Sequence, residues 1–385
     1  MRTTGLILAM VAFGGILSSG GAVAQVTCDD PPFDITQAVT VWDKTDFCTY
    51  QDGVFDQILS GGVPRDGIPP IDAPQFESIA AASAWLQPQS PVIAVQLDGE
   101  ARAYPLAILT RHEIVNDTIG EAAIAVTFCP LCNSAIVFDR TVDGQTLRFG
   151  VSGLLRNSDL IMWDDATQSW WQQFTGQGIV GQYTGTQLTV LPSQVVGFGQ
   201  FTEQYPDGLV LSRESGFGNS YGSNPYAGYD SSEQPFLFTG VVDARLPATE
   251  RVLAGLVGET PVAYPFSILS ERGVINDTIA DENVVALWQG GVASALDGRD
   301  IDSSKDVGTA ALFSRELDDQ TLTFSLGAGD MIQDDQTGST WNVFGTAVAG
   351  DLAGAQLEPF IAAPHFWFAW AAFQPETVLY TVGSG

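Results

Sequence analysis

The chain has 385 residues and carries 15 basic against 45 acidic side chains, a formal net charge of −30. A surface of this charge repels nucleic acid and anionic membranes, so we exclude nucleic acid as a partner. The length is sufficient for two or three ordinary domains with a substantial core.

Residues 1–24 are typical of a secretory signal peptide. Arg2 provides the charged start, residues 5–17 form a short apolar run, and residues 22–24 form a small-residue cleavage site. The apolar run is too short to cross a bilayer, and no later stretch approaches a membrane span. We therefore expect an exported protein, periplasmic or secreted, without integral membrane association.

Residues 25–60 form a predicted N-terminal arm that has little core of its own. The arm contains Cys28 and Cys48 in a segment rich in Pro and Asp. In an oxidising compartment such a pair usually forms a structural disulfide. We predict that a Cys28–Cys48 disulfide cross-links the arm internally.

Two parts of the chain repeat each other at a constant offset. The run Ala-Tyr-Pro at 103–105 returns at 263–265, and Asn-Asp-Thr-Ile at 116–119 returns at 276–279. Residues kept by both copies indicate scaffold, and residues present only in the first copy indicate chemistry. Three candidates are lost in the second copy: Cys129 becomes Gln289, Cys132 becomes Val292, and His112 becomes Arg272.

Short apolar runs separated by turn pairs predict a mainly β (β-rich α+β) fold. We expect two tandem related repeats, each resembling a β-sandwich or barrel: the first at 61–211 and a degenerate second at 248–385. Between them, residues 212–247 are predicted to form an ordered loop, rich in Gly and Tyr, that can cover the site. Strands are predicted at 92–97, 122–128, 135–138, 146–151, 160–163 and 170–174, and short helices at 77–86, 106–111, 267–272 and 365–373.

Cys129 and Cys132 form a Cys-x-x-Cys motif between two predicted strands. Such a pair can be a redox-active dithiol, a pair of metal ligands, or a structural disulfide or inert thiols. The second copy lacks both cysteines. The interpretation as a structural disulfide or inert thiols is therefore the weakest of the three. The sequence requires no cofactor with certainty, and the metal interpretation would call for copper or zinc.

His112 opens the run His-Glu-Ile-Val-Asn, which is not the zinc-protease pattern because Asn116 stands where the second His would be. We interpret His112 as a metal ligand or as a base for a Cys, against a hydrogen-bonded structural His. Glu113 is a candidate proton shuttle. Arg156 is a candidate for lowering a thiol pKa or binding an anion, against a simple pairing with Asp159.

A second set of polar residues is assigned to substrate binding. Gln172 and Gln173 lie on a predicted strand, where alternate side chains face inward. His365, which occurs only in the second copy, is expected to be a packed histidine. The full substrate-binding set is Asn157, Asp159, Gln172, Gln173, Arg65 and Tyr226.

Several long motifs resemble the bacterial and archaeal family called domain of unknown function 3179. They lie at 112–117, 127–135, 150–159 and 169–176, with shorter runs at 65–69 and 224–226. The resemblance covers about residues 61–380. Because some members of the family carry selenocysteine in the Cys-x-x-Cys, the resemblance implies redox chemistry at Cys129 or Cys132.

The leading hypothesis is an exported thiol–disulfide protein that acts through Cys129 and Cys132, with His112 nearby. Its partner would be a small molecule or a thiol or disulfide. The alternative is a copper or zinc protein with His112, Cys129 and Cys132 as ligands. A third hypothesis is a non-catalytic structural or interaction module.

Overall fold

The structure is a computed structural model that describes residues 25–26, 41–218 and 221–383. The predicted signal peptide and Cys28 lie outside the described residues. The predicted export and the predicted Cys28–Cys48 disulfide therefore stay predictions. No helix in the described part of the chain is both long enough and apolar enough to span a membrane.

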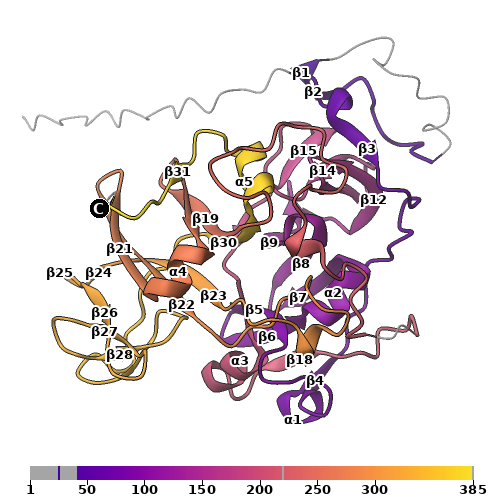
Figure 1. Ribbon diagram of the computed structural model, residues 1–385. Helices are drawn as coiled ribbons and strands as arrows, with labels where there is room; N and C mark the ends of the chain where they lie inside the picture. The colour runs from indigo at the N-terminus through magenta and orange to yellow at the C-terminus, as the bar shows by residue number, and fades with distance from the viewer. Residues whose placement is uncertain (1–24, 27–40, 219–220, 384–385) are drawn as a thin grey trace, which may run out of the picture.

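The fold is mainly β with a few short helices, which confirms the predicted fold class (Figure 1). The five α-helices of the described residues are each seven residues long or shorter. They are α1 (Ile79–Ala82), α2 (Leu106–His112), α3 (Phe198–Gln204), α4 (Phe266–Arg272) and α5 (Trp367–Phe373). Four 3-10 turns are η1 (Phe55–Gln57), η2 (Pro130–Cys132), η3 (Tyr229–Ser231) and η4 (Ile301–Ser303).

The first part of the chain builds three larger sheets, seen at the right of Figure 1 in indigo to magenta. The first runs β17 (Gln194–Gly197), β5 (Pro91–Leu97), β6 (Glu100–Pro105), β18 (Leu209–Leu211), β4 (Phe76–Ser78). The second runs β16 (Val190–Leu191), β9 (Ser134–Asp139), β8 (Ala122–Cys129), β7 (Ile114–Ile119). The third runs β1 (Gln25–Val26), β2 (Tyr50–Gln51), β15 (Gln177–Val180), β14 (Trp170–Gln172), β13 (Asp159–Asp164), β12 (Phe149–Arg156), β3 (Ile58–Ser60). A small hairpin pairs β10 (Thr141–Val142) with β11 (Gln145–Thr146).

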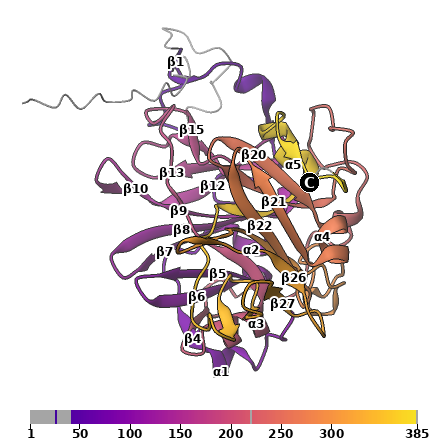
Figure 2. The same cartoon turned by 90° about the vertical axis from the view of Figure 1, so that its left-hand side faces the viewer.

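The second part of the chain, in orange to yellow, builds sheets of similar order (Figures 1 and 2). One runs β30 (Ala362–Phe366), β19 (Arg251–Val257), β20 (Thr260–Pro265), β31 (Val378–Leu379). Another runs β21 (Val274–Ile279), β22 (Glu282–Gln289), β23 (Thr309–Ser314). The last runs β26 (Phe324–Leu326), β27 (Ile332–Asp334), β28 (Thr340–Trp341), β29 (Ala347–Ala349), beside the hairpin β24 (Glu316–Leu317) and β25 (Gln320–Thr321).

The element order β–β–α–β–β occurs twice at the offset seen in the sequence. Three pairs of elements show this: β5 and β19, α2 and α4, and β8 and β22. In each pair the second element begins and ends the same number of residues after the first. The order is what the predicted duplication requires. The duplication itself, and the domain boundaries drawn from it, stay predictions.

Polar residues that both parts share make the same bonds in each part. The Asn116 amide exchanges two hydrogen bonds with the backbone of Phe149, at 2.8 and 2.9 Å. Asn276 makes the same pair with the backbone of Phe324, at 2.7 and 2.9 Å. Such bonds satisfy buried backbone groups where a strand leaves its ladder. The shared residues therefore serve the scaffold, as the sequence comparison predicted.

Distant strand pairing shortens two of the predicted helices. Residues 76–78, which overlap the predicted 77–86 helix, pair with β18 as β4, so that α1 begins at Ile79; it ends at Ala82. The predicted 365–373 helix begins at Trp367, because β30 pairs with β19 as far as Phe366. Backbone hydrogen bonds to a neighbouring strand outweigh a weak local preference for helix.

Candidate functional site

The Cys-x-x-Cys motif forms the tip of a β-hairpin. The strand β8 ends at Cys129, the turn η2 carries Cys132, and Cys129 pairs with Ser134 at the start of β9. Asn133 closes the turn in the left-handed region, with φ of 48°. Because an extended strand follows the second Cys, no α-helix begins there whose dipole could lower a thiol pKa.

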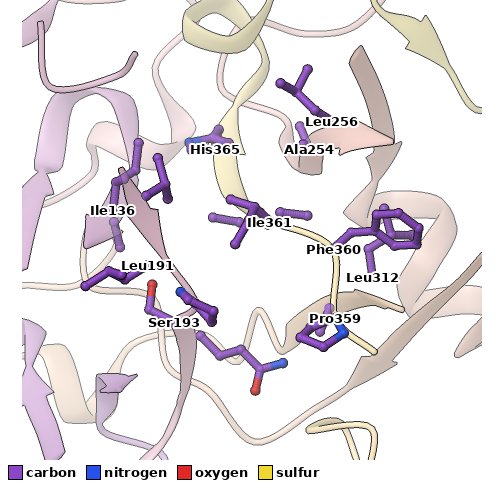
Figure 3. Close-up of a pocket in the computed structure, with 18 of the residues that line it drawn as sticks. Ile136, Leu191, Ser193, Ala254, Leu256, Leu312, Pro359, Phe360, Ile361 and His365 are labelled. Atoms are coloured by element: carbon purple, nitrogen blue, oxygen red, sulfur yellow. The ribbon is translucent and has the colours of Figure 1, made fainter. Parts of the chain in front are cut away.

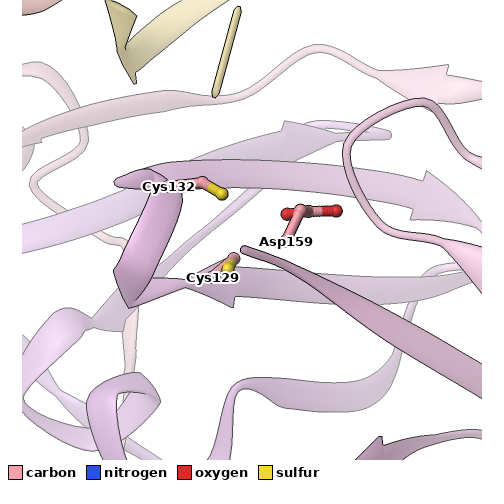
Figure 4. Close-up of side chains that lie close together, drawn as sticks. All are labelled: Cys129, Cys132 and Asp159. Carbon is pink, nitrogen blue, oxygen red and sulfur yellow. The ribbon is translucent and has the colours of Figure 1, made fainter. Parts of the chain in front are cut away.

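Asp159 completes a buried cluster with the two cysteines (Figure 4). One ligand atom of each of the three residues lies within 4.8 Å of the others. Cys129 is 2% exposed, and Cys132 and Asp159 are completely buried. Asp159 begins β13, directly after a tight turn at Asn157 and Ser158, both of which have positive φ. This turn brings the carboxylate to the thiols, although the cysteine motif and Asp159 lie on different hairpins.

The neighbouring strand orients the Asp159 carboxylate. Gln172 donates from Nε2 to Oδ2 at 2.6 Å, and the backbone N–H of Phe174 donates to the same oxygen at 2.9 Å. The other oxygen, Oδ1, is buried and accepts no hydrogen bond from a nitrogen or hydroxyl donor of the described residues, whereas the thiols of Cys129 and Cys132 are hydrogen-bonding neighbours of the carboxylate. Polar atoms in protein interiors almost always have partners. The remaining polar neighbours of the Asp159 carboxylate are therefore the two thiols.

Gln173, which follows the end of β14, hydrogen-bonds to the hairpin that carries the cysteines. Its Nε2 donates to Oγ1 of Thr127 at 2.8 Å and to the carbonyl oxygen of Ser134 at 3.3 Å. The two neighbouring glutamines thus have separate roles: Gln172 holds Asp159, and Gln173 holds the hairpin. Each Nε2 thus binds a protein group, whereas each Oε1 is buried without a partner among the described residues, and the assignment of both residues to substrate binding stays a prediction.

Glu113 lies beside this cluster in a strained backbone conformation. It caps α2 with φ of 58°, a region that favours glycine. The second part of the chain has Gly273 at the corresponding place, with φ of 67°. Glu113 is only 7% exposed and accepts a hydrogen bond from Oη of Tyr226 at 3.3 Å. Such strain on a buried acid is typical of a functional residue.

Burial raises the pKa of every acidic group in the cluster and of Glu113 beside it. It raises the pKa of both thiols, and that of Cys132 by more than that of Cys129. It also raises the pKa of Asp159 to about 7 and that of Glu113 to about 8. Desolvation disfavours each anion, and the negative charge of Asp159 adds to the effect on Glu113 and the thiols. The cluster is thus a concentration of acidic groups that a bound cation would stabilise.

His112 does not contribute to the cluster. One ring nitrogen contacts the carbonyl oxygen of Pro69 at 2.7 Å, and the other contacts Oη of Tyr221 at 2.8 Å. Burial lowers the pKa of its imidazole. Within the described ranges, the group of potential metal ligands comprises Cys129, Cys132 and Asp159. The structure therefore places Asp159, and not His112, beside the two thiols, and the metal-ligand set stays a prediction.

Arg156 bonds away from Asp159. Its guanidinium donates to Oε1 of Gln57 at 2.9 Å and to Oε1 of Gln51 at 3.4 Å. The ion pairs between described residues do not include Arg156 with Asp159, so the simple pairing expected from the sequence is wrong. Burial lowers the pKa of Arg156, which the charge of Asp159 partly offsets.

The remaining predicted site residues fall into two groups. Tyr226 belongs to the site through its bond to Glu113, and Asn157 forms the turn before Asp159. Arg65 instead stacks on the rings of Trp163 and Trp42, 4.6 and 5.0 Å from their centroids, which is a packing role.

The connecting loop reaches the site at several points. Besides Tyr226, the backbone carbonyl of Phe236 accepts a hydrogen bond from the Ser158 hydroxyl. Burial raises the pKa of Tyr229, and the charges of Cys132 and Cys129 add to this shift. The loop therefore lies over the cysteine turn and the Asp159 turn together.

The second part of the chain lacks every acidic group of the cluster. The shared Asp164–Trp171 and Asp334–Trp341 bonds, both 3.0 Å, align the two parts in this region and place Gly329 opposite Asp159. Gly273 stands opposite Glu113. Gln289 and Val292 stand opposite the cysteines at the offset of the repeat. The four acidic residues are absent together from the second part of the chain. This shared absence is the sequence signal that could have identified Asp159 and Glu113 as partners of the thiols.

Replacing Glu113 with glycine is expected to stabilise the metal-free protein. The change removes a left-handed non-glycine residue and a buried carboxyl, and we expect a gain of about 3–5 kcal/mol at pH 7. Because burial raises the folded pKa to about 8, the cost of Glu113 grows as the pH rises from its ordinary value of 4.5. Urea unfolding after chelation should show the gain increasing from pH 5 to pH 8. Glu113→Gln, which keeps the strained backbone, is the control; a destabilised Glu113→Gly protein would contradict the argument.

The fold and the cluster together define a mainly β protein with a buried Cys–Cys–Asp centre in its first part. Residues 65–377 match the family described as "Protein of unknown function (DUF3179)". The match covers most of the chain, so the protein belongs to this family. No curated protein and no solved structure matches the chain.

Proposed function

We propose that Cys129, Cys132 and Asp159 bind a divalent metal ion of the zinc type. The observation that carries the proposal is the buried cluster itself: the donor atoms of the three residues lie within 4.8 Å of one another, and two protein hydrogen bonds fix Oδ2 of the Asp159 carboxylate. Protein donors that hold a ligating carboxylate in this way are the usual surroundings of a metal ligand.

The spacing of the donors suits a tetrahedral ion. Ligands at zinc–sulfur and zinc–oxygen bond lengths lie about 3.3–3.8 Å from one another in a tetrahedron. The three donor atoms lie within 4.8 Å of one another, so small side-chain movements would complete the geometry. A carboxylate beside two thiolates favours zinc over Cu(I), which prefers soft ligands throughout. The alternative of copper is therefore the weaker one.

Three protein ligands leave one position open, as in catalytic rather than structural zinc sites. An ion bound there would supply a Lewis acid or an activated water molecule. Glu113 is the neighbouring group suited to hold or move a proton, since it is buried, hydrogen-bonded by Tyr226 and close enough for its charge to act on Cys129. A non-catalytic module would not need four acidic groups buried together. We also propose export, on the signal-like residues 1–24.

Metal analysis of the purified protein tests this proposal. Protein isolated without chelator should contain about one zinc per chain, and cobalt substitution should produce thiolate-to-metal absorption. Cys129→Ser, Cys132→Ser and Asp159→Asn should each weaken zinc binding at least tenfold, because each removes a ligand. Asp165→Asn, which changes an exposed carboxylate near the same sheet, should keep full zinc content. Metal-free wild-type protein that also fails to bind added zinc would overturn the proposal.

The second candidate is the redox-active dithiol favoured by the sequence. The proximity of the two thiols in one turn supports it, and the adjacent Asp159 could accept a thiol proton. Forming the Cys129–Cys132 disulfide would transfer two electrons and two protons to a disulfide partner, whose S–S bond breaks to give two thiols. Against it stand the burial of both thiols and their raised pKa values, since reactive thiols are usually exposed and acidic.

A redox titration separates the two candidates. A catalytic pair should cycle reversibly at a potential above about −300 mV, the usual limit for structural bridges. Cys129→Ser should then abolish turnover with little loss of stability. Reversible cycling in a protein that binds no zinc would favour the dithiol, and one firmly bound zinc that protects both thiols from alkylation would favour the metal centre.

A further inference from the structure

A cavity of about 660 Å³ lies between the two parts of the chain and is lined by residues of both (Figure 3). Its volume is within the range of about 300–1,000 Å³ typical of small-molecule sites. Ile136, Leu191 and Ser193 form the wall from the first part. The facing wall comes from the second part and includes Ala254, Leu312, Phe360 and Ile361.

The wall of the cavity carries no formal charge. None of the described residues that line it is Asp, Glu, Lys or Arg, although 16% of the chain is charged. Its polar lining consists of amides and hydroxyls, such as Gln96, Ser193 and Gln194. An ionic ligand would lose its hydration without gaining a counter-ion. The chemistry of the wall therefore selects an uncharged, mostly apolar occupant.

Two large apolar side chains of the cavity wall are open to solvent. Leu256 and Ile361 both line the cavity, and they are 43% and 45% exposed. Large apolar side chains that line an open hollow are typical of a binding site rather than of ordinary surface.

His365 places one polar group in the apolar wall. It is 3% exposed, its ring stacks on Trp370 at 5.6 Å and lies 4.8 Å from the ring of Phe174. Its Nδ1 is buried and has no hydrogen-bond partner among the described residues. Burial lowers the pKa of His365 to about 3, so the imidazole is neutral at pH 7 and carries one N–H donor. A histidine ring whose polar atoms lack protein partners in the described part of the chain, and which lies in an apolar wall, is a group that a hydrogen-bonding ligand would satisfy.

We propose that this cavity binds a neutral, mostly apolar molecule with a carbonyl oxygen that accepts a hydrogen bond from His365. The site does not depend on the proposed metal. It does share a wall with the cysteine cluster: the ring of Phe174 lines the cavity, and its backbone N–H binds Asp159. Ala135, which closely follows the cysteine turn, lines the cavity as well.

Titration with prodan, a neutral naphthalene with a single ketone, tests the site by its polarity-sensitive fluorescence. Wild-type protein should bind one prodan per chain with saturation and a blue-shifted emission. Ser193→Phe, which fills the cavity from the link between β16 and β17, should weaken binding at least tenfold. Leu256→Trp, at a lining residue that is 43% exposed, is a second filling variant that does not alter the core. Val241→Phe, at a residue that is 96% exposed and outside the cavity, should bind like wild type.

The role of His365 is tested with a pair of probes. His365→Phe keeps an aromatic ring over Trp370 but removes the donor, so it should weaken prodan binding about three- to tenfold. N-phenyl-1-naphthylamine, which is neutral and has no carbonyl, should bind the same variant within twofold of wild type. The proposal is overturned if prodan shows no saturable binding, if both filling variants bind normally, or if His365→Phe weakens both probes equally.

Discussion

Asp164→Ala is expected to lower the free energy of unfolding by about 3–5 kcal/mol. Asp164 is completely buried and accepts hydrogen bonds from the backbone N–H groups of Thr167 and Ser169, at 2.7 and 3.1 Å, and from Nε1 of Trp171 at 3.0 Å. Alanine would leave these buried donors without an acceptor, at a cost of about 1–3 kcal/mol each before relaxation. Urea unfolding at pH 7 measures the loss.

Two further variants test whether the loss of stability comes from the buried Asp164 carboxylate. Asp165→Ala, at the exposed neighbouring position, removes only a bond from the Arg148 backbone at 3.2 Å and should cost less than about 1 kcal/mol. Asp334 binds Thr337 and Trp341 at 2.6 and 3.0 Å, as Asp164 binds its own partners. Asp334→Ala should therefore cost nearly as much as Asp164→Ala. A large loss in only one of the two would contradict a shared scaffold role.

The strands were largely predictable, because turn signals in the sequence are local. Asp98-Gly99 marks the hairpin between β5 and β6, and Asp98 has the positive φ that such a turn requires. The helix boundaries were less predictable. Residues 76–78 and 362–366 become strands only because β18 and β19 lie beside them, and these partners are distant in the chain.

The candidate site was partly predictable for a related reason. Comparing the two parts of the chain identified Cys129 and Cys132 as residues specific to the first. It could not establish that His112 turns toward Pro69 and Tyr221, since both contacts depend on how distant loops pack. The approach of Asp159 to the thiols likewise depends on where the β12–β13 hairpin lies. Motif spacing identifies candidate residues, and tertiary packing decides which of them meet.

His365 is expected to make the protein sensitive to acid. Its pKa is lowered from 6.5 to about 3 in the folded protein by burial. Between these values the unfolded chain binds a proton that the folded chain excludes, so the free energy of unfolding falls as the pH falls from 6.5 towards 3. The slope is about 1.4 kcal/mol per pH unit, or about 2–3 kcal/mol lost on going from pH 7 to pH 4.5.

His365→Phe removes this proton-binding group and should remove its share of the acid sensitivity. The many carboxyl groups also titrate in this range, so the quantity to compare is the difference in unfolding free energy between variant and wild type. That difference should shift in favour of the variant by about 2–3 kcal/mol from pH 7 to pH 4.5. Trp370→Phe is the matched control, because it disturbs the same packing and a bond to Thr377 of 2.9 Å without removing a titrating group. Its difference from wild type should be the same at both pH values, and a His365→Phe difference that also stayed constant would show that His365 is protonated in the folded protein.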